Sequence, residues 1–183
     1  TLTVVSRLIR SGYYDKTICH RLTTEDFYFL QCGDPTGTGF GSPDFDYKAD
    51  NLPTSREFIY AAGTVVMVNT SFRRNGSQFM IFYEDSKLPM GYTVWGRVTS
   101  GLEIVRFIAE GGVKNAESDG VPLRTIAIDR ASTNNEVLFR TYHFKYRSDS
   151  PYSQALSFSV LLAPTSHHVF ELFVMCSLTY MRM

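Results

Sequence analysis

The sequence has no excess of either charge and no long apolar run. Its 183 residues include 18 Lys and Arg against 18 Asp and Glu, so the formal net charge is zero. A balanced charge argues against a protein whose main task is to bind nucleic acid, and we expect no nucleic-acid partner. The most apolar stretch, 155–183, is interrupted by Pro164 and Glu171, and neither half approaches about 20 residues. Association with a membrane is therefore not expected.

Cysteine is also scarce. The three cysteines, Cys19, Cys32 and Cys176, are too few and odd in number for a disulfide scaffold. The simplest interpretation is a reducing, cytoplasmic compartment. The cysteines and the four histidines do not have the usual spacings of a zinc site, so we expect no metal ion. The chain also does not begin with a basic segment and an apolar run, as a signal peptide does.

Aromatic and β-branched residues are plentiful and lie in short runs. These runs predict strands at 28–31, 58–60, 64–68, 79–83, 92–98 and 125–128. Apolar residues at helical spacing predict one short helix over 2–10 and a second that begins near Leu102 and ends before Gly111. Many short strands with two helices favour a mainly β fold, a barrel with helical plugs, over an alternating α/β fold.

The chain changes character after residue 133. Residues 142–146 alternate only roughly between apolar and charged side chains, whereas 156–160 alternate cleanly with serine. A turn signal at 148–151 separates the two runs, which together predict a β-hairpin. We therefore divide the chain into a barrel core, 1–133, and a C-terminal segment, 134–183.

Four polar residues lie among apolar residues of the predicted strands: Arg21, Gln31, Asn69 and Gln78. One interpretation is that each is hydrogen-bonded locally at a strand end. The other is a shallow apolar groove with a few fixed donors, which suits an extended peptide. The glycine-rich segment 33–41 lacks the Gly-Lys-Ser/Thr sequence of a phosphate loop and predicts a surface loop.

Several segments together resemble the cyclophilin-type peptidyl-prolyl cis–trans isomerases, especially their bacterial, actinobacterial-like branch. The matching segments follow the family's order and are 12–17, 19–24, 30–39, 75–79 and 92–98. The resemblance implies a closed antiparallel eight-stranded β-barrel capped by two short α-helices. It also implies an enzyme that catalyses rotation about X–Pro bonds and assists protein folding, with no cofactor.

The resemblance also implies which residues form the site. The catalytic residues are expected to be Arg21 and Gln31. The expected substrate-binding residues are Tyr28, Phe29, Gly39, Val68, Asn69, Thr70, Gln78, Met80, Leu88 and Tyr92. The implied partners are proline-containing peptides and unfolded protein clients.

Some of these positions depart from the family's pattern. Met80 stands where the family has phenylalanine in the proline pocket, and Val68 and Thr70 replace alanines and narrow the groove. Lys87 replaces a tryptophan, so we expect weak binding of cyclosporin. These departures favour an alternative function, a proline-peptide binding module of the same fold with weak or no turnover.

A further departure concerns the architecture. The chain begins at the family's first helix, so the usual opening β-hairpin is missing and the barrel would have an open edge. Residues 142–146 and 155–165 loosely resemble that hairpin. One hypothesis is a circular permutation, in which the C-terminal segment supplies the hairpin. The alternatives are an unrelated tail, or a fragment whose real start is lost.

Overall fold

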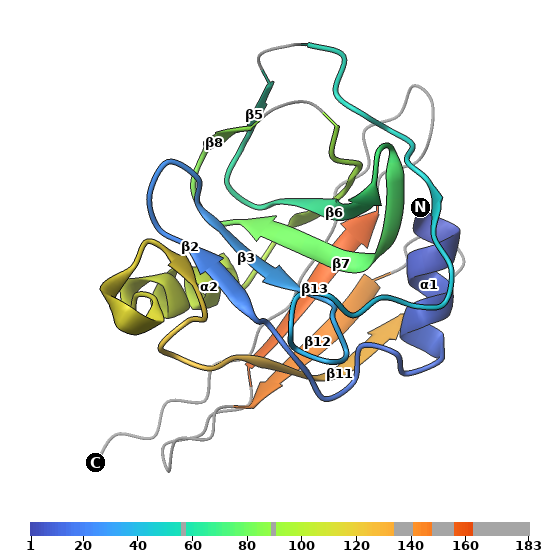
Figure 1. The fold of residues 1–183 in the computed structure, drawn as a ribbon. Coiled ribbons are helices and arrows are strands. Elements are labelled where there is room, and N and C mark those ends of the chain that lie inside the picture. Colours follow the sequence, from blue (N-terminus) through green and yellow to red (C-terminus); the bar gives the residue numbers. More distant parts are fainter. Residues whose placement is uncertain (56–57, 89–90, 134–140, 148–155, 163–183) are drawn as a thin grey trace.

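The computed structural model of the chain describes residues 1–55, 58–88, 91–133, 141–147 and 156–162 (Figure 1). It is mainly β with two α-helices, as expected, and both helices lie where the apolar spacing predicts them: α1 (Leu2–Arg10) and α2 (Leu102–Glu110). A 3₁₀ turn covers Lys114–Ala116. None of the helices within these ranges is long and apolar enough to cross a membrane.

The pairings between the described strands are all antiparallel. The strands are β1 (Thr17–Ile18), β2 (Arg21–Thr23), β3 (Phe29–Cys32), β4 (Tyr47–Lys48), β5 (Phe58–Tyr60), β6 (Thr64–Ser71), β7 (Arg74–Phe82), β8 (Ser86–Leu88), β9 (Val94–Val98), β10 (Asp119–Gly120), β11 (Ala127–Thr133), β12 (Thr141–Arg147) and β13 (Leu156–Leu162). Eleven form one sheet in the order β1-β11-β12-β13-β9-β6-β7-β3-β2-β10, with β4 paired to β7, and β5 and β8 form a separate pair.

The strand order of the main sheet is open. Within the residues that the structure describes, no pairing joins β1 to β10, so the expected closed barrel of eight strands is not established by the hydrogen bonds. The chain nevertheless runs directly from β1, at one end of the order, to β2, which is next to the other end, because only Cys19 and His20 separate these strands. The segment from β1 to β2 therefore pairs with β11 at its start and with β3 at its end.

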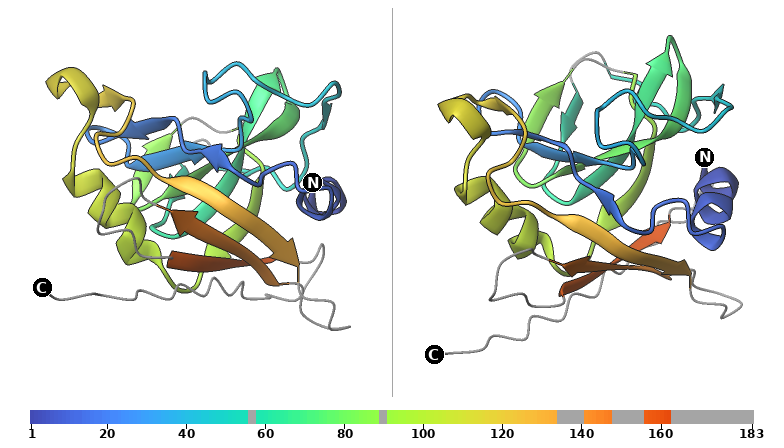
Figure 2. Two further views of the ribbon diagram at one scale, coloured as in Figure 1. Left: turned by 90° about the horizontal axis from the view of Figure 1, so that it is seen from below. Right: turned by 60° about the horizontal axis from the view of Figure 1, so that its bottom comes forward.

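The two C-terminal strands belong to the main sheet. β12 and β13 are antiparallel, with Phe144 opposite Phe158. β12 also pairs with β11, and β13 pairs with β9, where Val160 lies opposite Val98. Figure 2 shows both strands beside β11, on the side of the molecule away from the β6–β7 hairpin. The β12–β13 pair therefore lies between two strands of the core, β11 and β9, that do not pair with each other.

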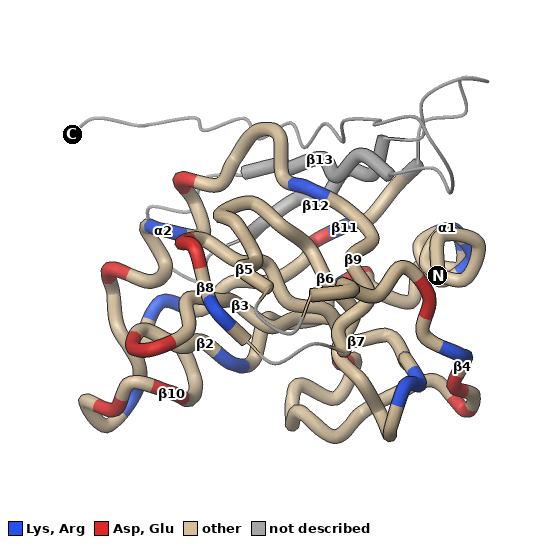
Figure 3. The backbone as a smooth tube through the Cα atoms, turned by 90° about the horizontal axis from the view of Figure 1, so that it is seen from above, with Lys and Arg blue, Asp and Glu red and all other residues tan. Residues whose placement is uncertain are grey.

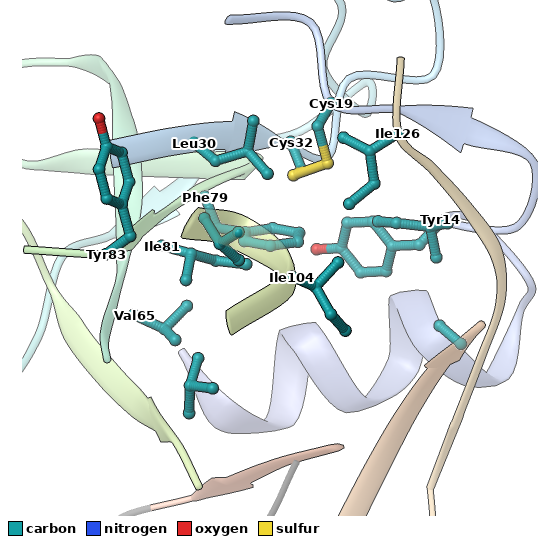
Figure 4. Packing of buried hydrophobic residues seen from close by; sticks show 14 of the residues in the cluster. Tyr14, Cys19, Leu30, Cys32, Val65, Phe79, Ile81, Tyr83, Ile104 and Ile126 are labelled. Carbon is teal, nitrogen blue, oxygen red and sulfur yellow. A yellow bond between two sulfur atoms is a disulfide. The ribbon is translucent and has the colours of Figure 1, made fainter. Parts of the chain in front are cut away.

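Two apolar clusters fill the two faces of β3, β6 and β7. The large cluster, shown in part in Figure 4, consists of Val5, Leu8, Ile9, Tyr14, Cys19, Leu22, Leu30, Cys32, Val65, Met67, Phe79, Ile81, Tyr83, Trp95, Val98, Ile104, Val105, Ile108, Val113, Ile126, Ile128 and Ala131. The small cluster consists of Phe29, Tyr60, Val66, Met80, Phe82 and Leu88. Along β7, Phe79 and Ile81 enter the large cluster while Met80 and Phe82 enter the small one, because successive side chains of a strand point to opposite faces.

Cys19 and Cys32 form a disulfide inside the large cluster, thirteen positions apart in the sequence (Figure 4). The expectation that the cysteines are reduced is therefore wrong for this pair. The pairing of β2 with β3 brings them together, since the His20 amide next to Cys19 donates to the carbonyl of Gln31, next to Cys32, at 3.1 Å. Cys176 lies outside the described residues.

Candidate functional site

Arg21 begins β2 and lies opposite Gln31 of β3. Its guanidinium carbon is 5.2 Å from the centroid of the Phe29 ring, within the range of a cation–π contact. One guanidinium nitrogen, Nη1, donates to Oε1 of Gln31 at 3.3 Å. The Arg21 side chain is 43% exposed, so the guanidinium lies over an apolar ring and remains accessible from outside.

The other edge of the guanidinium is held by Asp119 of β10. Nε of Arg21 donates to Oδ1 at 2.7 Å, and Nη2 donates to Oδ2 at 2.6 Å, which makes a bidentate ion pair. The hydrogen bond to Asp119 raises the pKa of Arg21, and partial burial opposes this only in part. The same hydrogen bond lowers the pKa of the Asp119 carboxyl. The guanidinium is therefore charged and doubly held at one edge.

Two glutamines continue the hydrogen bonds away from Arg21. Nε2 of Gln31 donates to Oε1 of Gln78 at 2.7 Å. Nε2 of Gln78 then donates to the carbonyl oxygens of Gly39 and Gly41, at 2.9 and 2.8 Å. Because each amide oxygen accepts and each amide nitrogen donates, these contacts fix the orientation of both side chains. Gln31, Gln78 and Gly39, all predicted site residues, thus continue one chain of hydrogen bonds that begins at Arg21.

The loop at the end of this chain of hydrogen bonds is folded around a buried carboxylate. Asp34 is fully buried and accepts hydrogen bonds from the amides of Thr36, Gly39 and Gly41, at 2.7, 2.6 and 3.1 Å. Burial by itself raises the pKa of Asp34, but a hydrogen bond from the Thr36 hydroxyl at 2.8 Å and the three amide hydrogen bonds outweigh it and lower the pKa to about 2. A Cβ at Gly41 would lie 1.9 Å from Oδ1 of Asp34, so only glycine allows this close approach.

The small cluster gathers five of the predicted substrate-binding residues beside Arg21. Phe29, Met80 and Leu88 are only 3%, 3% and 7% exposed and form its centre. Val68 and Tyr92 are partly buried and pack against it. The arrangement provides an apolar surface next to one charged donor, which is what a proline ring and its amide require.

Other predicted residues lie elsewhere. Tyr28 packs edge-to-face on Tyr83, with ring centroids 5.9 Å apart, and contacts the large cluster instead of the small one. Asn69 donates through Nδ2 to the carbonyl of Gly91 at 2.9 Å, and its Oδ1 is buried with no partner among the described residues. Thr70 is exposed, and its hydroxyl donates to the carbonyl of Arg74 at 3.3 Å.

Sequence reasoning missed three residues that support the site. Tyr60 stacks on Phe82 within the small cluster, with centroids 5.0 Å apart and planes 9° apart. Asp34 could have been found, since an Asp followed by Thr36 and closely spaced glycines is typical of a loop closed by a carboxylate. Asp119 gives no such signal, because only the pairing of distant strands brings it to Arg21.

The family profile described as "Cyclophilin type peptidyl-prolyl cis-trans isomerase/CLD" matches residues 3–133. The chain belongs to this family. Within it, the chain is similar to the probable peptidyl-prolyl cis-trans isomerase B of Mycobacterium leprae, with 36% identity over 140 residues that cover 70% of this chain and 48% of the relative. The corresponding protein of Mycobacterium tuberculosis is 39% identical over 132 residues, which cover 66% of this chain and 43% of the relative. The actinobacterial similarity expected from the motifs is thus confirmed.

The cyclophilin chain spans about half the length of these mycobacterial relatives. It covers more of the peptidyl-prolyl cis-trans isomerase cypE of Dictyostelium discoideum, at 33% identity over 129 residues, 69% of this chain and 79% of the relative. Among solved structures, a cyclophilin of Cryptosporidium parvum crystallised in the presence of the dipeptide Ala-Pro is similar, with a TM-score of 0.56 and 29% identity. That likeness covers 70% of this chain and 81% of the other.

Proposed function

We propose that the chain catalyses cis–trans isomerisation of X–Pro peptide bonds, and that Arg21 carries the reaction. The observation that carries the proposal is the position of the Arg21 guanidinium, 5.2 Å above the Phe29 ring at the edge of the small cluster. Three of its five N–H groups bond to Asp119 and Gln31 in the part of the chain that the structure describes. One N–H group on Nη1 and one on Nη2 are then left to bond to a substrate. Membership of the cyclophilin family supports the same activity.

The chemistry needs no covalent step. An X–Pro bond rotates slowly because amide resonance presents a barrier of about 18–20 kcal/mol. A hydrogen bond from a guanidinium to the prolyl nitrogen favours a pyramidal nitrogen and so weakens the partial double bond. Arginine suits this task because it stays charged and its donors are held in a rigid plane. Arg21 would therefore act on the twisted amide as a fixed donor.

The apolar surface supplies the other half of the mechanism. The proline ring would lie on Phe29, Met80 and Leu88, which exclude water and strengthen the polar contact beside them. Gln31 and the backbone of Asn69 would hold the flanking peptide, so that the twisted amide is bound better than either planar isomer. The Cryptosporidium cyclophilin crystallised in the presence of Ala-Pro supports a proline peptide as the ligand. Unfolded proteins with accessible prolines would be the clients.

A second function, a proline-peptide binding module with little turnover, is favoured by Met80. Its thioether chain fills the pocket but holds a ring less rigidly than phenylalanine would. Val68 and Thr70, in place of the family's alanines, act in the same direction by narrowing the groove. For cyclosporin, we keep the prediction of weak binding, because Lys87 occupies the position of the family's tryptophan.

For the architecture, we propose that β12 and β13 fill the place of the family's opening hairpin and complete a closed barrel. Their pairing with β11 on one side and β9 on the other supports this assignment. The barrel would then consist of the core 1–133 and a hairpin contributed by 134–183, as in a circular permutation. The cytoplasmic location stays a prediction, and the Cys19–Cys32 disulfide argues against it because such bonds are rare in reducing compartments.

The function can be tested by a protease-free isomerisation assay on an X–Pro peptide, with peptide binding measured on the same samples. We expect Arg21→Ala to lower kcat/KM by about 100-fold or more, as for loss of one strong transition-state donor, while binding is partly kept. Arg7→Ala on the exposed face of α1 is the matched control and should leave the rate unchanged. Binding without any rate above the uncatalysed one would favour the binding module, and the absence of both would contradict the proposal.

A further inference from the structure

We propose that Asp119 is a positioning residue for the isomerisation, because its carboxylate fixes the plane and direction of the Arg21 guanidinium. This inference rests on the proposed function. Asp119 does not belong to the apolar surface or to the hydrogen bonds of the two glutamines, and the motifs of the sequence do not indicate it. It acts through Arg21 alone.

The fold places Asp119 beside Arg21 by backbone pairing. β10 is antiparallel to β2, with Asp119 opposite Thr23 and Gly120 opposite Leu22. The amide of Thr24 donates to the carbonyl of Ser118 at 2.8 Å and extends this pairing. Arg21 and Asp119 are therefore diagonal neighbours on one face of the sheet, within reach of long side chains.

The contacts of the guanidinium differ in strength. The bonds to Asp119 are short, 2.7 and 2.6 Å, and come from two nitrogens of one edge, so they define both the plane and its rotation. The bond to Gln31 is single and long, at 3.3 Å, and the Phe29 ring constrains only one face. Without Asp119, the flexible arginine stem would sample many rotamers and present its free N–H groups to the prolyl nitrogen only part of the time.

Because the Arg21–Asp119 ion pair is exposed, its effect on turnover can be measured separately from its effect on the stability of the fold. The side chains of Arg21 and Asp119 are 43% and 49% exposed, and ion pairs this accessible contribute little to the stability of a fold. Loss of the Asp119 carboxylate should therefore leave the protein folded. A change in turnover would then report the orientation of Arg21.

A neighbouring carboxylate provides the matched control. Asp119 lines an open hollow of about 540 Å³ together with Thr24, Glu25, Ala116, Glu117 and Ser118. Glu117 precedes Asp119 by two residues and is exposed, and it forms no ion pair with any residue in the described ranges. Glu117→Gln removes one negative charge from the same hollow and leaves the Arg21–Asp119 ion pair in place. It therefore separates the effect of negative charge in the hollow from the effect of direct contact between Asp119 and Arg21.

The test compares Asp119→Ala, Asp119→Asn and Glu117→Gln with the wild-type chain in the isomerisation assay, with KM and kcat determined separately. We expect Asp119→Ala to lower kcat by about 10- to 100-fold, the range typical of a misplaced catalytic group, with KM changed less than twofold. Asp119→Asn keeps one accepting oxygen and should fall between Asp119→Ala and wild type. Glu117→Gln should match wild type. The ¹⁵N signal of Arg21 Nε should show increased mobility in Asp119→Ala.

The outcomes distinguish the inference from the function on which it rests. A wild-type chain without activity overturns both. An active wild type with unchanged kcat in Asp119→Ala overturns the inference alone, as does an equal loss in Glu117→Gln. If circular dichroism shows that Asp119→Ala is unfolded, Asp119→Asn decides: a lowered kcat with an unchanged KM supports positioning, and a wild-type kcat contradicts it.

Discussion

Strands β3, β6 and β7 have two apolar faces that are covered in different ways. On one face, the large cluster is enclosed by α1, α2 and the remaining strands, and Leu30, Val65 and Ile81 are at most 1% exposed. On the other face, the small cluster is bordered by partly buried Phe58, Val68, Tyr92 and Val94, and the guanidinium of Arg21 lies over its Phe29 ring. Figure 3 shows the charged residues of β2 and β10 near each other at this side, where Arg21 and Asp119 form their ion pair.

The comparison explains why one sheet can provide both a core and a site. The large cluster is closed on every side, so its side chains contribute stability. The small cluster is also buried at its centre, but its margin carries donors with fixed directions: Arg21, Gln31 and Gln78. A ligand that completes the apolar packing there would also meet the donors.

The largest effect is expected from adjacent residues of β7 that point to opposite faces. Ile81 in the large cluster is 1% exposed, and Met80 in the small cluster is 3% exposed. Truncation of either to alanine should cost about 2–5 kcal/mol of unfolding free energy, with Ile81→Ala nearer the upper end because its enclosed site cannot collapse. For activity per folded molecule we expect the opposite order, with Met80→Ala lowering kcat/KM by about tenfold or more.

Chemical denaturation and the isomerisation assay on the same two variants check this prediction. Met80→Leu conserves volume and serves as the control, and it should cost less than about 1.5 kcal/mol. An equal loss of activity per folded molecule in Ile81→Ala and Met80→Ala would show that the two faces do not differ in role.

The next effect concerns the disulfide. Reduction of Cys19–Cys32 releases a loop of thirteen positions and should lower the unfolding free energy by about 3 kcal/mol. Because Cys32 directly follows Gln31 and Cys19 precedes Arg21 by two residues, we also expect a lower turnover in the reduced protein. Thermal unfolding with and without a phosphine reductant measures the first effect. The melting temperature of the Cys19→Ser/Cys32→Ser variant should be the same with and without the reductant. An unchanged melting temperature of the wild type on reduction would contradict the account.

A smaller effect is expected from the carboxylate in the loop. The pKa of Asp34 in the folded chain is about 2, below its ordinary value of 3.8, so the unfolded chain binds the proton more readily. The stabilisation from Asp34 is therefore complete above about pH 4 and is lost as the pH falls towards 2, by about 1–2 kcal/mol. Asp34→Asn should lack this part of the pH dependence of unfolding, whereas Asp44→Asn in the same loop should keep it. Parallel pH profiles for wild type and Asp34→Asn would refute the assignment.

Local patterns in the sequence predicted the long elements well. The apolar spacing gave both helices, and the β-branched and aromatic runs gave the positions of β3, β5, β6, β7 and β9. The run predicted at 125–128 overlaps β11 only at Ala127 and Ile128. The assignment of faces could not be predicted, because Val65–Val68 and Phe79–Phe82 are apolar at every position when both faces of a sheet are covered. The short strands β1, β2, β4, β8 and β10 were missed because two or three residues have no recognisable period.

The site shows the same limit. The family motifs pointed to Arg21, Gln31, Gln78, Phe29 and Met80, which the structure brings together. The motifs did not identify the Asp119 contact or the Cys19–Cys32 disulfide. Both depend on pairing between strands, β2 with β10 and β2 with β3, and spacing along the chain carries no record of such pairing.

The central claim, that a proline peptide binds on the small-cluster face beside Arg21 and is isomerised there, can be tested in one titration. An X–Pro peptide is added to methyl-labelled protein while exchange between its cis and trans signals is followed by NMR. The account predicts that the methyl signals of Met80, Leu88 and Val68 shift while those of Ile81 and Val65 do not, and that exchange is accelerated. Shifts confined to the large cluster, or accelerated exchange that persists in Arg21→Ala, would contradict it.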